Sequence, residues 1–61
     1  MKMLQCEGHT VTFERENKEK GVMIITEQYG PNDIKHSKRS GIKDAIAYMS
    51  ELIKLGYVSA N

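Results

Sequence analysis

The sequence predicts one small α+β domain over residues 1–61, with a three-stranded antiparallel meander followed by one C-terminal helix packed on one face of the sheet. Three observations predict this fold. Polar and apolar residues alternate with period two in the first half of the chain, and polar segments containing glycine separate the alternating stretches. From Ile42 onward, the apolar residues recur every three or four positions, which is the helical period.

The predicted strands cover residues 2–6, 9–14 and 22–27. The second strand alternates polar and apolar side chains, and the third is rich in β-branched residues. Glu7-Gly8 suits a two-residue hairpin turn, because glycine readily adopts the positive φ that tight hairpins need. Residues 16–21 are polar and end in glycine, which suits a longer hairpin loop.

These turns set a predicted register. A turn at Glu7-Gly8 pairs Leu4 with Val11, and a loop at residues 17–20 pairs Phe13 with Ile24. The face predicted to form the core then carries Leu4, Cys6, Val11, Phe13, Val22 and Ile24. The other face carries Met1, Met3, Met23 and Ile25 among Thr10, Thr12 and Glu14. That second face is unusually apolar for a surface in contact with solvent.

Residues 30–40 are predicted to be a connection, because they are rich in turn residues and charges. The helix is expected to begin near Ser40, a favoured N-cap residue, and to stop at Gly56. Its main apolar stripe consists of Ile42, Ala45, Ile46, Met49, Leu52 and Ile53, and Tyr48 and Leu55 widen the stripe.

Composition limits the class of protein. A chain of 61 residues buries a thin core, and self-association is the simplest way to complete it. The single cysteine, Cys6, excludes an internal disulfide and suggests a reducing compartment. No apolar run is long enough to span a bilayer, and the N-terminus lacks a signal-peptide pattern. A cytoplasmic protein with no membrane partner is therefore expected.

The apolar second face predicts a non-catalytic protein that acts through protein–protein contact, as a homodimer or with another protein. The predicted contact residues are Met3, Met23, Ile25, Tyr48 and Leu55. A regulator or inhibitor of the phage or mobile-element type fits the size of the chain. The simpler interpretation is that these residues belong to an ordinary core.

The alternative is a nucleic-acid-binding module that uses the segment from Lys35 to Lys43. Lys35, Lys38, Arg39 and Lys43 lead into the predicted helix N-terminus, where backbone N–H groups favour phosphate. Two features weigh against it: the net charge is only +1, and no aromatic residue is interleaved with these cations in the sequence.

Catalytic and metal sites find little support in the sequence. Cys6, His9 and His36 are three potential metal ligands without a clear fourth, and a small buried thiol beside a turn histidine is the simpler interpretation. The chain has no glycine-rich phosphate loop and no recognisable nucleophile motif. No cofactor and no enzymatic activity are expected.

Basic residues leading into Ser40-Gly41-Ile42-Lys43-Asp44-Ala45, after three strands, loosely resemble the arm-type DNA-binding domain at the N-terminus of tyrosine integrases. The resemblance implies that the sheet enters the major groove and the helix supports it. It covers a strand order and about six residues, and the predicted open face carries methionine and threonine where that family has arginine and aromatic residues.

Overall fold

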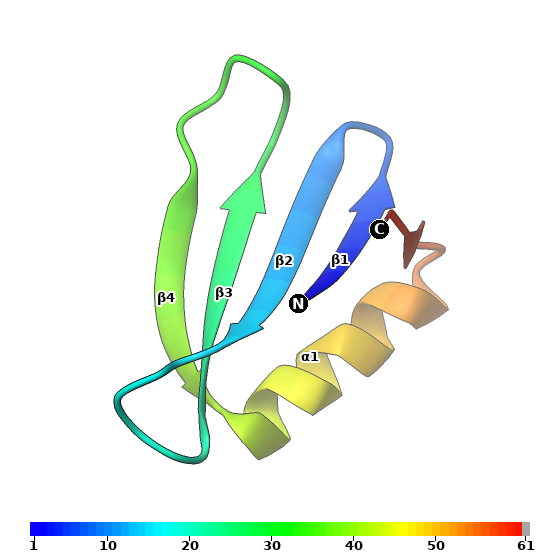
Figure 1. Cartoon of the computed structure of the whole chain (residues 1–61). Coiled ribbons are helices and arrows are strands. Elements are labelled where there is room, and N and C mark those ends of the chain that lie inside the picture. Colours follow the sequence, from blue (N-terminus) through cyan, green and yellow to red (C-terminus); the bar gives the residue numbers. More distant parts are fainter. Residues whose placement is uncertain (61) are drawn as a thin grey trace.

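The computed structural model describes residues 1–60 and shows an antiparallel sheet with one C-terminal helix, α1 (Ile42–Lys54), across one face (Figure 1). Within these residues the sheet has five strands in the order β4-β3-β2-β1-β5. Their bounds are β1 (Lys2–Cys6), β2 (His9–Arg15), β3 (Val22–Gln28), β4 (His36–Gly41) and β5 (Val58–Ser59). The predicted α+β class is confirmed, and α1 is neither long nor apolar enough to cross a membrane.

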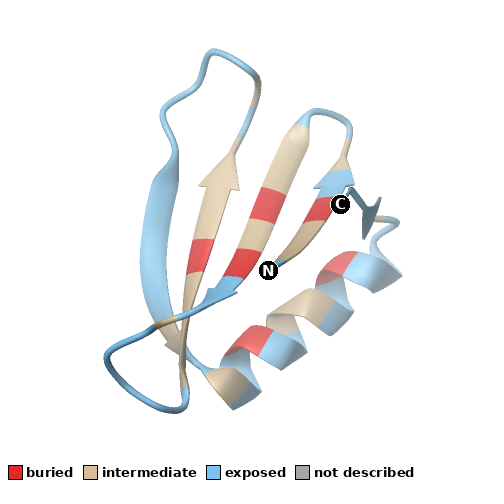
Figure 2. Ribbon diagram, viewed as in Figure 1, coloured by how far each residue is buried: buried red, intermediate tan, exposed pale blue. Residues whose placement is uncertain are grey.

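Two of the strands, β4 and β5, were not expected from the sequence. All residues of β4 except Gly41 lie within the predicted connection, residues 30–40, yet the strand pairs along six positions with β3. This strand has no apolar alternation to reveal it, because it forms the edge of the sheet and is almost entirely exposed (Figure 2). The two-residue strand β5 pairs with β1, where Val58 lies opposite Gln5.

The first hairpin has the predicted register, with Leu4 opposite Val11 and Cys6 opposite His9. Both turn residues have positive φ, 46° at Glu7 and 84° at Gly8. A positive φ at both central positions is the type I′ pattern that matches the twist of a hairpin.

The predicted register of the second hairpin is wrong by one residue. Phe13 lies opposite Ile25, not Ile24. The cause is Gly21, whose φ of 78° makes it a loop residue. The hydrogen bond from the Glu16 amide to the Val22 carbonyl, 3.1 Å, therefore closes a loop one residue longer than predicted.

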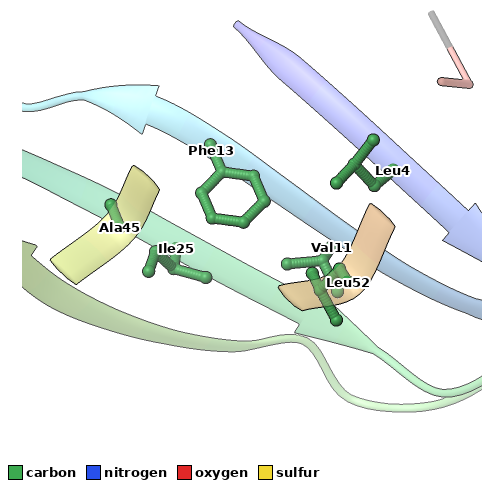
Figure 3. Close-up of a cluster of buried hydrophobic side chains, with 6 residues drawn as sticks. All are labelled: Leu4, Val11, Phe13, Ile25, Ala45 and Leu52. Atoms are coloured by element: carbon green, nitrogen blue, oxygen red, sulfur yellow. The ribbon is translucent and has the colours of Figure 1, made fainter. Parts of the chain in front are cut away.

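This shift exchanges the two faces of β3. Ile25 is 2% exposed and Met23 packs against the core, so neither lies on an open apolar face as predicted. Ile24 and Val22 take the opposite face of the strand and are half-buried. The core consists of Leu4, Val11, Phe13 and Ile25 from the sheet, with Ala45 and Leu52 from α1 (Figure 3).

The helix begins slightly later than predicted. Gly41, not Ser40, occupies the N-cap position in an extended conformation, and no side chain caps the helix. The predicted stop at Gly56 is confirmed, because Gly56 has a φ of 101° and the Tyr57 amide donates back to the Leu52 carbonyl at 3.0 Å. This reversal returns the chain toward the sheet, where Tyr57 packs against the core.

Candidate binding surfaces

A polar network lies on the helix side of the sheet and is centred on His9. Its Nε2 is 2.9 Å from Glu27 Oε1, and its Nδ1 is 2.5 Å from the Tyr57 hydroxyl. The Tyr48 hydroxyl donates to the same Glu27 oxygen at 3.1 Å. The network thus joins the start of β2, the end of β3, the helix and the segment that follows the helix.

The chemistry of these groups fixes the direction of the two hydrogen bonds to Glu27 and leaves that between His9 and Tyr57 dependent on the form of the imidazole. A carboxylate can only accept, so His9 donates from Nε2 to Glu27. In a neutral imidazole Nδ1 is then the acceptor, and Tyr57 donates to it. Burial raises the pKa of Tyr48 to about 12, with further contributions from the hydrogen bond and the charge of Glu27. Burial also raises the pKa of Tyr57.

These directions bear on what the network can do. The raised pKa values of Tyr48 and Tyr57 keep both hydroxyls in the protonated form. Tyr48 is therefore a hydrogen-bond donor to Glu27 at neutral pH, and the contact of Tyr57 with His9 anchors the chain after the helix to the sheet. No sequence pattern indicates this network, because its members are spread from position 9 to position 57.

Tyr29 lies at the outer edge of this network. Its ring stacks on the His9 ring with 4.1 Å between centroids and 5° between planes. Tyr29 is nonetheless 63% exposed, since it follows β3 at the start of the loop that leads to β4. Lys38 of β4 lies nearby on the helix side, with its Nζ 5.2 Å from the centroid of the Tyr48 ring. The Tyr48 ring, which follows the basic segment in sequence, is thus close to one of its lysines in space.

The four basic residues of the predicted nucleic-acid site do not converge on one surface. Lys38 lies opposite Ile25 and shares the helix side of the sheet, whereas Arg39, the next residue along the strand, faces the open side. Lys35 precedes β4 and Lys43 lies in the first turn of α1. The helix N-terminus and the edge strand therefore do not form the single phosphate site that the sequence suggested.

Arg39 is also engaged by acidic residues. Its Nη2 is 3.3 Å from Glu16 Oε2 and 3.1 Å from Glu19 Oε2. Both carboxylates come from the loop between β2 and β3. The Arg39 charge is therefore largely neutralised within the chain.

The predicted protein-contact residues lie in three different settings. Met23 and Ile25 are inside, as described above. Met3 pairs with Thr12, so its side chain is on the open side of the sheet, where it is half-buried. Tyr48 belongs to the His9 network. Leu55 follows the helix and is 71% exposed. The single apolar patch expected from the sequence is not assembled.

A different apolar surface, on the helix, is exposed instead. Ile42, Ile46, Met49 and Ile53 follow one another at spacings of four, three and four, which place them in one line along α1. Ile46 and Ile53 are each 54% exposed, and Ile42 and Met49 are half-buried. We call these four residues the helix seam. The adjacent line, Ala45 and Leu52, is buried against the sheet.

The potential metal ligands named from the sequence do not form a site. Cys6 and His9 are opposite each other in the first hairpin, but both ring nitrogens of His9 are hydrogen-bonded. His36 lies on β4 opposite Glu27. Among residues 1–60, no three His, Cys, Asp or Glu side chains are grouped to hold a metal ion.

Comparison with known proteins adds no relative to this description, since neither a family model, nor a curated protein, nor a solved structure matches the chain significantly.

Proposed function

We propose that this protein acts by protein–protein contact and that it does so as a homodimer joined through the helix seam. The observation that carries the proposal is the half-exposure of Ile46 and Ile53 in line with Ile42 and Met49. Spacings of four, three and four are those of alternating a and d positions in a coiled coil, so another helix is the occupant that fits. A second copy of the chain supplies an identical helix, and one surface then serves both partners.

The residues that flank the helix seam are compatible with this contact. Lys43 and Ser50 follow Ile42 and Met49 on the outer side, and Ala45 and Leu52 lie on the side of the sheet. No carboxylate lies within the helix seam itself. A contact between two copies would therefore bury apolar groups without placing like charges opposite one another within the seam.

The free energy gained by burying the helix seam indicates a weak dimer. Complete burial of an isoleucine side chain contributes about 2 kcal/mol, so covering the exposed half of Ile46 and of Ile53 contributes about 1 kcal/mol each. A symmetric contact counts each residue twice, which gives about 4 kcal/mol from these two positions. Association itself costs about 4 kcal/mol or more, so the rest of the interface supplies the net affinity.

Sedimentation velocity over a range of concentrations tests the proposal. We expect the wild-type chain to shift from monomer to dimer with rising concentration. The double substitution Ile46→Lys and Ile53→Lys should abolish the shift and leave the circular dichroism of the fold unchanged, because both side chains are half-exposed. The matched control is Ala47→Lys, an exposed position on the outer face of the same helix. A wild-type chain that stays monomeric throughout, or equal weakening by the control, would refute the proposal.

A further inference from the structure

A second surface, independent of the helix seam, lies on the other flank of α1. Ile46 and Tyr48 are two positions apart, so their side chains project to nearly opposite flanks of the helix. The flank that carries Tyr48 lies over β3 and β4, as the contacts of Tyr48 with Glu27 and Lys38 show. Tyr29, His36 and Lys38 are exposed on this side of the sheet, and the exposed Lys35 lies directly before β4; we call these four residues the tyrosine–lysine shelf.

Tyr29 gives the shelf a rigid aromatic surface. One face of its ring is stacked on His9, whose two ring nitrogens are held by Glu27 and Tyr57. The ring is 63% exposed, so its other face is open to solvent. A ring fixed in this way has little conformational entropy left to lose when a flat ligand stacks on it.

The lysines of the shelf have no carboxylate partner among the described residues, although Lys38 Nζ lies 5.2 Å from the centroid of the Tyr48 ring. Over the described residues 1–60, neither Lys35 nor Lys38 forms an ion pair, in contrast to Arg39. His36 lies opposite Glu27 and Lys38 opposite Ile25, so both side chains project from the helix side of β4. The neighbouring carboxylate, Glu27, already accepts hydrogen bonds from His9 and Tyr48. The two lysines give the shelf a positive charge, and Asp33, two positions before Lys35, is an exposed carboxylate close to it in sequence.

An open aromatic ring and lysines that form no ion pair are two elements that bind single-stranded nucleic acid. Unpaired bases stack on aromatic side chains, and cations contact the phosphates that link them. A duplex does not offer a free base face to a ring of this kind. We propose that single-stranded nucleic acid binds at the tyrosine–lysine shelf, with one base stacked on Tyr29 and phosphates beside Lys35 and Lys38.

The dependence on salt follows from the small number of cations. Each phosphate contact to a single strand changes the slope of log K against log salt by about −0.7, so two lysines predict a slope of about −1.4. This slope is shallow, which agrees with a net charge of +1. Stacking on Tyr29 should therefore supply a large share of the affinity.

Fluorescence anisotropy with a labelled oligothymidine of about ten nucleotides, the length of a typical single-strand site, tests the proposal. We expect saturable binding at low salt, weakened at least about fivefold by Tyr29→Ala, the lower end of the cost of losing one stacked base. Tyr29→Phe should retain binding, because it keeps the ring. Lys38→Gln should reduce the salt slope by about 0.7.

The matched control is Lys54→Gln, which makes the same change of charge at the far end of α1 and should leave affinity unchanged. Absence of binding by the wild-type chain at low salt would overturn the proposal. The proposal would also be overturned if Lys38→Gln and Lys54→Gln lost affinity equally while Tyr29→Ala had no effect, because that pattern indicates non-specific electrostatic attraction. Equal affinity for duplex DNA would overturn it as well. The helix-seam double variant should bind as a monomer, which separates this test from the one for dimerisation.

Discussion

Replacing Tyr48 with phenylalanine should remove part of the pH dependence of the free energy of unfolding at alkaline pH. The pKa of Tyr48 is raised from 10.0 to about 12 in the folded chain, first by burial and then by Glu27. The unfolded chain loses this proton near pH 10, whereas the folded chain holds it until about pH 12. The folded state thus binds the proton more tightly, so the stabilisation is complete below pH 10 and is lost as pH rises from 10 to about 12.

The magnitude follows from the size of the shift. Two pKa units correspond to about 2.7 kcal/mol, and the partial contact of Tyr48 with solvent reduces this to about 1–2 kcal/mol. At about pH 8 the variant Tyr48→Phe should be less stable than the wild type by about 1–2 kcal/mol, the usual net value of a hydrogen bond to a charged acceptor. Near about pH 12 the two proteins should be almost equally stable, because the wild type has then lost its advantage.

Urea unfolding followed by circular dichroism, in a series from about pH 8 to about pH 12, measures this difference. Lysines and the other tyrosines also titrate in this range, but they do so in both proteins. The difference between the two free energies of unfolding therefore isolates Tyr48. A difference that stays constant over the whole series would refute the assignment of Tyr48 as a buried donor to Glu27.

Two further predictions concern the backbone and the register. Ile25→Asp should prevent folding, because it places an unpaired charge at a position that is 2% exposed. Ile24→Asp lies on the other face and should fold. Circular dichroism of both variants therefore distinguishes the observed register from the register that places Ile25 on the open face. Gly56→Ala should lower the free energy of unfolding by about 1 kcal/mol, because alanine is strained at a φ of 101°, and urea unfolding that shows no loss would contradict the role of Gly56 in ending the helix.

The elements that local chemistry determines could be predicted from the sequence. The Glu7-Gly8 turn has two residues and a conformation that few residue types adopt, so it fixed the pairing of Leu4 with Val11. The helix stop at Gly56 depends on one glycine in the same way. The predicted register of the second hairpin was wrong because a loop of several polar residues does not reveal whether Gly21 belongs to the loop or to the strand.

The candidate surfaces could not be predicted because they depend on contacts across the fold. The His9 network combines residues from two strands, the helix and the segment that follows the helix. Their spacing in the sequence matches no known motif. The edge strand β4 has no apolar face, so its sequence resembles an irregular basic segment. The sequence therefore does not show that Lys38 and Arg39 project to opposite sides of the sheet. The stripe on α1 was visible in the sequence, but which part of it the sheet leaves uncovered was not.

The pairing of β5 with β1 has a consequence for the order of folding during synthesis. Ala60 donates its amide to the Met3 carbonyl at 2.9 Å, and Val58 lies opposite Gln5, so the outer edge of β1 is covered by residues translated more than fifty positions later. The hairpins can form as the chain emerges from the ribosome, but Leu4 and Phe13 remain without Leu52 above them until the helix is complete. The nascent sheet therefore carries an open strand edge that must be protected from pairing with other chains until translation has passed residue 60.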